Sequence, residues 1–118
     1  MAHDRRPPRP MREPTYFVLA ALLDGPLHGY GIIQHAYQLS GQRVRLAAGT
    51  LYEALDRLAS SGDITVDRQE TVDGRVRRYY RLTQQGRHAL HQEATRMEQA
   101  ARIVTRRPAT PASRPSPA

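Results

Sequence analysis

The dipeptide Asp73-Gly74 separates two runs in which apolar and polar residues alternate, and this pattern is a strong signal for a β-hairpin. The first run begins at Ile64, and the second ends at Leu82. Successive side chains of a strand point to opposite faces, so each strand has one inward and one outward face. In the second strand the predicted inward face carries Val76, Arg78, Tyr80 and Leu82, and the outward face carries Arg77, Tyr79 and Arg81.

Helical periodicity predicts three helices before the hairpin and one long helix after it. On the second helix Ile33 and Tyr37 share one face. On the third helix Leu51, Leu55 and Leu58 form a single apolar stripe, because residues four and seven positions apart lie on the same face. The predicted helices cover residues 15–24, 28–39, about 46–60 and 83–104.

This order of elements predicts a winged helix-turn-helix over residues 15–82. The expected fold class is mainly α with a small β-hairpin wing (α+β), followed by a long C-terminal helix at 83–104. Both flanking segments, 1–14 and 105–118, are rich in proline and contain arginine, so they cannot bury enough apolar surface to become ordered. We expect a basic, disordered arm and a disordered tail, and Met11 could be the true start of the chain.

The composition excludes several classes of protein. The chain has no cysteine, which excludes disulfides, thiol catalysis and zinc sites built on cysteine. No apolar run approaches the ~20 residues that a membrane-spanning helix requires. Residues 1–14 also lack the apolar segment of a signal peptide. We therefore expect a cytoplasmic protein without a membrane partner.

The positive charge is concentrated in one segment of the chain. All 18 basic residues are arginines, and the formal net charge is +7. Residues 75–88 contain five arginines and no acidic residue, whereas residues 61–74 have a net charge of −3. Arginines beside a glycine at the tip of a wing suit phosphates or a narrow minor groove. A solvated edge is the alternative, but the basic row favours contact with nucleic acid.

The third helix of a winged helix-turn-helix lies in the major groove, so the face opposite its core should carry hydrogen-bonding groups. Thr50, Glu53 and Arg57 lie opposite the leucine stripe, and Tyr52 flanks them. Gly49 at the start of the helix lets the backbone approach a phosphate. The residues of the wing predicted to contact DNA are Gly74, Arg75, Arg77, Tyr79 and Arg81.

Three segments resemble the PadR family of bacterial transcriptional regulators: PLHGYGII at 26–33, GTLYEALDRL at 49–58 and RYYRLTQQG at 78–86. Together, in this order, the matches span about residues 15–104. The resemblance implies a homodimer that represses transcription from double-stranded DNA, with Tyr30, Thr50, Leu51 and Tyr52 near the DNA. Because Leu51 also lies in the apolar stripe, a role in the core alone is the alternative for this residue.

Two features depart from the pattern of this family. Glu53 stands where many members have proline, and a carboxylate in the major groove can accept a hydrogen bond from cytosine N4. The chain also lacks tryptophan, so it cannot hold a planar drug between tryptophans as some relatives do.

The long helix carries a heptad pattern, with apolar residues recurring at spacings of four and three. The resemblance implies that this helix makes much of the dimer interface, and the first helix is the other expected surface. Packing of the stripe on its own domain is the alternative. An effector molecule would have to use Tyr16, Phe17 or Met97 around a cavity between subunits. The predicted interface residues are Tyr16, Phe17, Leu90, Ala94, Met97, Ala101 and Val104.

Other functions have weaker support in the sequence. His88 and His91 lie one helical turn apart, but no third ligand cluster accompanies them, so we predict no metal and no other cofactor. A domain of this size offers little room for a catalytic pocket, so we predict no enzyme activity. RNA binding would rest on Tyr79 alone. The main alternative is a winged helix that serves as a protein-interaction module without sequence-specific DNA binding.

Overall fold

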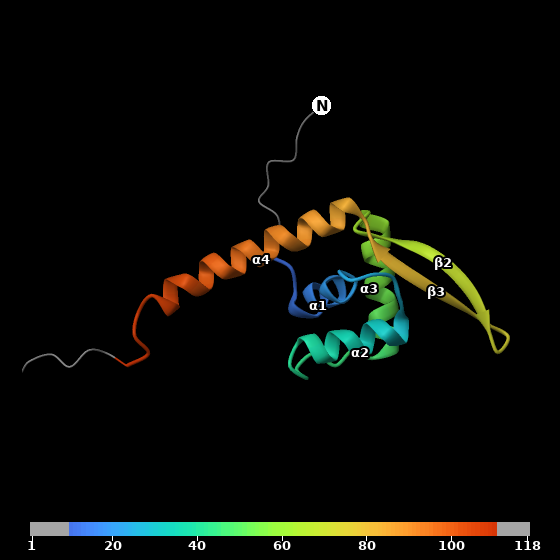
Figure 1. Ribbon diagram of the computed structural model, residues 1–118, viewed down its shortest axis with the longest axis horizontal. Coiled ribbons are helices and arrows are strands. Elements are labelled where there is room, and N and C mark those ends of the chain that lie inside the picture. The colour runs from blue at the N-terminus through green and yellow to red at the C-terminus, as the bar shows by residue number, and fades with distance from the viewer. Residues whose placement is uncertain (1–9, 111–118) are drawn as a thin grey trace, which may run out of the picture.

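The computed structural model describes residues 10–110 (Figure 1). It contains four helices and a three-stranded antiparallel sheet with the strand order β1-β3-β2. The predicted α+β winged helix-turn-helix with a long C-terminal helix is confirmed, and the short strand β1 is an addition to it. The elements are α1 (Glu13–Ala21), β1 (Leu27–His28), α2 (Gly29–Leu39), α3 (Ala48–Ser61), β2 (Ile64–Val72), β3 (Arg75–Leu82) and α4 (Gln84–Thr105).

The two flanking segments fall partly outside this description. Residues 1–9 of the predicted arm and residues 111–118 of the predicted tail are not among the described residues. Helix α1 begins at Glu13, two residues earlier than expected, with Pro14 in its first turn, where a proline is tolerated. No helix within residues 10–110 combines the length and the apolar character needed to cross a membrane.

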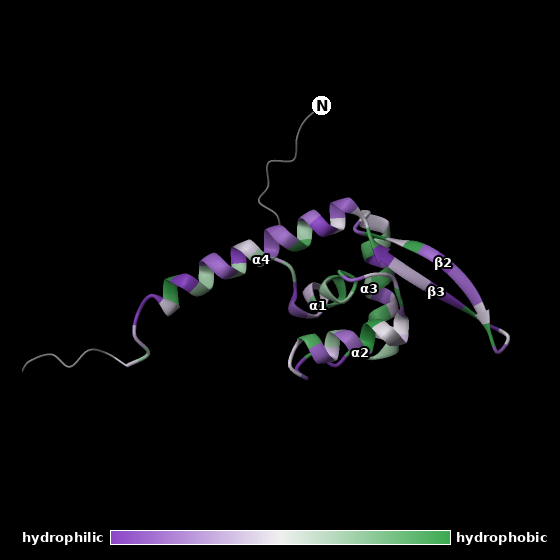
Figure 2. Ribbon diagram, viewed as in Figure 1, coloured by the Kyte–Doolittle hydropathy of each residue, from purple (hydrophilic) through white to green (hydrophobic). Residues whose placement is uncertain are grey.

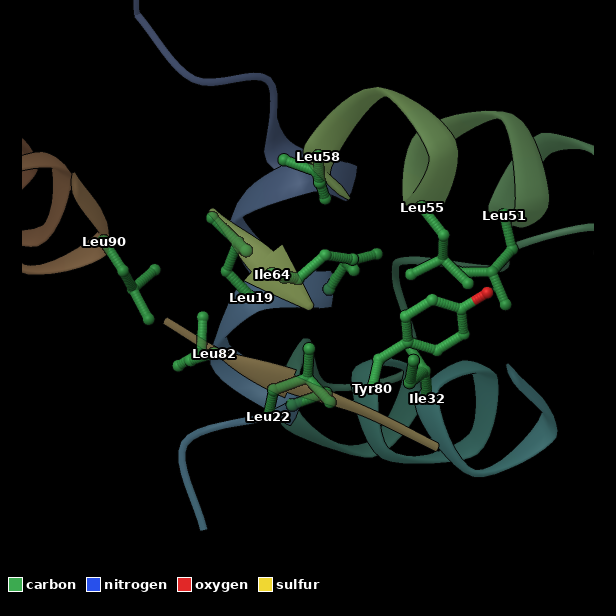
Figure 3. Packing of buried hydrophobic residues seen from close by; sticks show 12 residues of the cluster. Leu19, Leu22, Ile32, Leu51, Leu55, Leu58, Ile64, Tyr80, Leu82 and Leu90 are labelled. Carbon is green, nitrogen blue, oxygen red and sulfur yellow. The ribbon is translucent and has the colours of Figure 1, made fainter. Parts of the chain in front are cut away.

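The core holds α3 against α1 and α2 (Figure 3). Leu51 and Leu55 of the predicted stripe are fully buried against Leu19 and Ile32, and Leu58 is also buried. Burying a side chain of this size contributes about 1.5–3 kcal/mol, so these contacts fix which face of α3 is left for solvent. The buried face of α2 carries Ile32 and Ala36, whereas the neighbouring residues Ile33 and Tyr37 are only partly buried.

The hairpin has the turn that the sequence predicts. Asp73 and Gly74 both have positive φ, 52° and 76°, as a two-residue type I′ turn requires. Of the predicted inward face of β3, Tyr80 and Leu82 are buried, but Val76 is 64 % exposed and Arg78 is also exposed. Val76 and Arg78 lie on the same face of β3 as Tyr80 and Leu82 by alternation, but the hairpin extends beyond the helices, so this face meets the core only at its base (Figure 1).

Helix α4 is joined to the rest of the fold at the turn between α3 and β2. The Thr83 hydroxyl donates to the Gly62 carbonyl at 2.6 Å and accepts from the Gly86 N–H at 3.0 Å, which caps α4. The Thr83 N–H donates to the Asp63 carbonyl at 3.1 Å. A Cβ at Gly86 would lie 1.9 Å from that carbonyl oxygen. Glycine is therefore the residue that this close approach of two backbones permits.

A buried carboxylate ties the segment before α1 to α4. Glu93 is 7 % exposed, and its Oε2 accepts the Met11 N–H at 3.3 Å. Arg96 pairs with the same carboxylate and, with the Met11 N–H, lowers the pKa of Glu93. Residues 10–12 of the predicted arm are thus in contact with the fold rather than separate from it.

The second half of α4 projects away from the other helices (Figure 1). Leu90, which was predicted as a dimer-interface residue, is 3 % exposed and belongs to the core of the chain itself, so it is not part of an open surface of α4. Residues 95–105 are all exposed. Three of them, Met97, Ala101 and Val104, continue the heptad pattern, and apolar positions recur along this half (Figure 2).

Replacing Gly86 tests the junction between α4 and the α3–β2 turn. We expect Gly86→Ala to lower the free energy of unfolding by at least about 2–3 kcal/mol, because the added methyl group overlaps the Asp63 carbonyl and forces the backbones apart. Gly49→Ala is the matched control, since a Cβ there meets no atom within 4 Å. Urea unfolding measures both variants, and a similar stability for the two would contradict the requirement for glycine at 86.

Candidate functional site

A groove of about 950 Å³ lies between the wing, the N-terminus of α2 and one edge of α3. Tyr30 of α2, Tyr52 of α3 and the wing residues Arg75 and Arg77 line it, so four predicted DNA-contacting residues from three separate segments meet there. Because the wing wall is formed by the part of β3 that extends beyond the core, the groove is open to solvent.

Each of the two tyrosines of the groove lies against a residue of α2. Tyr30 is 66 % exposed and Tyr52 is 53 % exposed. A Cβ at Gly29 would lie 3.0 Å from the Tyr52 hydroxyl oxygen, so a glycine at this position lets the Tyr52 ring lie across the start of α2. The Tyr30 hydroxyl accepts a hydrogen bond from Gln34 Nε2 at 3.1 Å, which leaves its own O–H available as a donor.

The predicted residues of α3 are not all available to a ligand. Gly49, Thr50 and Glu53 are exposed, as expected. Leu51 is fully buried in the core, so its place among the predicted DNA contacts is corrected. Arg57 donates from Nη2 to the Thr15 hydroxyl of α1 at 3.3 Å, which directs it toward α1.

Sequence reasoning missed Asp56, which lines the groove one turn after Tyr52. The available signal was helical spacing: residues four apart share a face, so a groove at Tyr52 extends to Asp56. This carboxylate lies on the α3 wall, opposite the arginines of the wing. The groove therefore has one wall with an acidic group and one that is basic.

The arginines of the wing differ in their partners. Arg81 Nε lies 3.6 Å from Asp67 Oδ1, and Arg68 Nε donates to Glu70 at 3.0 Å. Arg75, Arg77 and Arg78 line the groove instead, and none of the three has an ion-pair partner among the described residues. Sequence reasoning placed Arg78 on the inward face and so left it out of the site.

The charge of the wing is smaller than the sequence suggested. Residues 64–82, the complete hairpin, contain five arginines and three carboxylates, a net charge of +2. The value of +5 for residues 75–88 omitted the acidic strand β2, which pairs with β3 along its whole length, and included Arg87, which lies on α4.

Tyr79 lies in a row of stacked side chains across the sheet. It pairs with His28 of β1 on one side and with Arg68 of β2 on the other. The His28 and Tyr79 rings meet edge to face with centroids 5.4 Å apart, and the Arg68 guanidinium lies 4.0 Å from the Tyr79 centroid. Arg68 and His28 thus occupy the ring surface that a predicted DNA contact would use.

His28 connects this row of side chains to α2. Its Nδ1 accepts the Gly31 N–H at 3.2 Å and caps the helix. Partial burial, and then the positive charge of Arg77, lower the pKa of His28, while Glu70 opposes the shift. The folded chain therefore favours the neutral form of the His28 imidazole, whose Nδ1 can accept the Gly31 N–H.

The other predicted residues lie outside the groove. Gly74 is at the tip of the wing with nothing within 4 Å of an added Cβ. Tyr16 and Phe17 are partly buried on α1 and meet edge to face with centroids 5.2 Å apart. His88 and His91 are exposed on α4, and no group of three or more metal-ligating side chains occurs within residues 10–110.

A buried leucine stripe that presents the opposite face of α3 beside a basic two-stranded wing defines a winged helix-turn-helix protein, here followed by a projecting helix. Residues 18–92 match the transcriptional regulator PadR-like family. The chain is also 40 % identical over 87 residues to the transcriptional regulator Rv3488 of Mycobacterium tuberculosis. The aligned residues make up 74 % of this chain and 78 % of the relative. The chain belongs to the PadR-like family of transcriptional regulators.

Solved structures share this fold. A PadR-like transcription factor from Bacteroides fragilis superposes with a TM-score of 0.66 and 27 % identity, over 78 % of this chain and 86 % of that one. Bacillus subtilis PadR in complex with operator DNA superposes with a TM-score of 0.61 and 24 % identity, over 89 % of this chain and 54 % of that one. The present chain thus matches about half of the B. subtilis protein.

The cap at His28 predicts a dependence of stability on pH. The pKa of His28 is lower in the folded chain than its ordinary value of 6.5, so the unfolded chain binds more protons as pH falls below 6.5. The stabilisation by neutral His28 is complete above that pH and is lost as His28 becomes protonated. We expect His28→Asn, which keeps an acceptor for Gly31, to lose less stability than the wild type between about pH 7.5 and 5.5.

Urea unfolding at both pH values measures this difference. Comparison with His28→Asn isolates the contribution of His28, because the two proteins differ only at this residue. If the wild type and the variant lose the same stability on acidification, the cap at His28 does not control the pH dependence.

Proposed function

We propose that the chain is a homodimeric transcriptional repressor that binds an inverted-repeat operator in double-stranded DNA with sequence specificity. The observation that carries the proposal is the groove in which the exposed edge of α3 faces the arginines of the wing. Membership of a family of transcriptional regulators supports it, and so does the fold shared with a PadR structure in complex with operator DNA. Such a repressor acts in the bacterial cytoplasm, on the nucleoid.

In this proposal α3 enters the major groove. Thr50 and Glu53, in the exposed first half of α3, meet the base edges, where Glu53 accepts from cytosine N4. Arg75 and Arg77 of the wing hold the neighbouring backbone or minor groove. Tyr30 donates its hydroxyl proton to a phosphate, for which the hydrogen bond from Gln34 leaves it free.

The projecting half of α4 supports the homodimer. Met97, Ala101 and Val104 are exposed on one face of α4, and burial of apolar surface is the main driving force for association. Ala94 is partly buried at the start of this face. A second copy of α4 packed on this face would link two winged helix-turn-helix units.

Relief of repression by a small molecule completes the proposal. Tyr16 and Phe17 form an aromatic pair on α1, which packs against α4. With Met97 contributed at the interface, these side chains offer an apolar lining for a planar effector between subunits, in a chain that has no tryptophan.

The protein-interaction module stays as a second candidate because of two observations. The complete hairpin has a net charge of only +2, and Glu53 and Asp56 both lie on the exposed side of α3. Carboxylates facing a duplex repel its phosphates, whereas they suit a basic surface on a protein partner.

Footprinting of the purified protein on the DNA upstream of its own gene distinguishes the two candidates. A dimer with two-fold symmetry should protect a palindrome whose half-sites are about 10 bp apart, or a multiple of this, because each α3 needs the same face of the duplex. The absence of protection even at low salt would contradict the repressor and favour the protein-interaction module.

Charged substitutions on α4 test the dimer. We expect the double variant Met97→Glu, Val104→Glu to sediment as a monomer, because it would place carboxylates in the proposed apolar interface. Ile103→Glu is the matched control: Ile103 is also exposed and apolar, but helical spacing puts it on the opposite face of α4. A dimeric double variant, or an Ile103→Glu variant that dissociates as readily, would show that the interface lies elsewhere.

A further inference from the structure

Arg78 and Arg81 lie on the same strand, three residues apart, but in different surroundings. Arg78 lines the groove between the wing and α3, and its cross-strand partner is the uncharged Gln69. Arg81 lies outside the groove lining, and its guanidinium faces Asp67 at 3.6 Å. The two arginines therefore have the same formal charge but different availability to a ligand.

The surroundings of Arg78 suit an anion. Among residues 10–110 no carboxylate lies within 4.0 Å of its guanidinium, so its five N–H donors and its full charge are available. Tyr30 and Tyr52, on the opposite wall, are each more than half exposed, and a tyrosine hydroxyl can also donate to a phosphate oxygen. Asp56 on the α3 wall repels a phosphate, so the anion belongs on the wing side of the groove, at Arg78.

The surroundings of Arg81 suit a structural role. Asp67 lies at an irregularity in the pairing of β2 with β3, between Val66 and Arg68. Its carboxylate is within 4.0 Å of both Arg68 on the same strand and Arg81 on β3, and the contact with Arg81 bridges the two strands at the base of the wing. For Arg81 to bind a phosphate, it would first have to leave this carboxylate.

We propose that Arg78 binds a backbone phosphate of the DNA strand that passes through the groove between α3 and the wing, and that Arg81 braces the base of the wing without contacting DNA. This assignment rests on the proposed DNA-binding function and specifies which arginines serve it. It replaces one predicted contact, Arg81, with a residue that lay outside the predicted site.

Matched substitutions of the two arginines test the assignment. The dependence of the dissociation constant on salt is measured by fluorescence anisotropy for the wild type, Arg78→Ala and Arg81→Ala, with a labelled duplex of the upstream DNA. Each phosphate contact contributes about 0.9 to the log–log slope. We expect Arg78→Ala to lower the slope by about 0.9 and to weaken binding about tenfold at fixed salt, because a charged hydrogen bond is lost. Arg81→Ala should keep the wild-type slope.

Three results would count against the assignment or its basis. An unchanged slope for Arg78→Ala, or an equal decrease for Arg81→Ala, would overturn it while leaving DNA binding intact. A wild-type protein that binds neither this duplex nor a random-sequence duplex at low salt would instead refute the proposed function itself. Circular dichroism of both variants confirms folding, and Arg78→Gln serves as a second variant with the same expected slope.

Discussion

The close approach of Gly86 to the Asp63 carbonyl is the constraint on which the arrangement of this protein depends. At this point the end of α3, the start of the hairpin and the start of α4 meet within one helical turn, joined by the hydrogen bonds of Thr83. Because α3 ends at Gly62 in a left-handed conformation (φ 88°), the chain turns directly into β2. The directions of α3, the wing and the projecting helix are therefore fixed together at this junction.

The segment at 49–52 combines packing and exposure in adjacent residues. Leu51 is fully buried, whereas Thr50 and Tyr52 on either side are exposed. Burying the leucine fixes the rotation of α3, and the rotation decides that Thr50 and Tyr52 face solvent. Resemblance to a family treats these residues as one motif, but their burial separates the residue that orients the helix from those available to a ligand.

Sequence patterns predicted the elements of this fold better than the surroundings of those elements. The leucine stripe of α3 and the Asp73-Gly74 turn depend on local periodicity and backbone conformation, and both could be predicted. Alternation along β3 correctly paired Val76 with Tyr80 on one face, but it does not show where the core ends, so the groove at Arg78 was missed. In the same way, the heptad pattern of α4 is continuous, while only the structure divides it between the core at Leu90 and the exposed face at Met97.

The net charge of a sequence segment also differs from the net charge of the hairpin to which it contributes. Antiparallel pairing places the acidic residues of β2 beside the arginines of β3, so part of the positive charge is used inside the hairpin. Salt bridges exposed to this degree contribute little to stability, but they hold Arg68 and Arg81 in place at the base of the wing. Arg75, Arg77 and Arg78, farther along β3, have no ion-pair partner among residues 10–110 and line the groove. The hairpin therefore needs more arginines than its net charge suggests, because some maintain its shape and the others remain available to an anionic ligand.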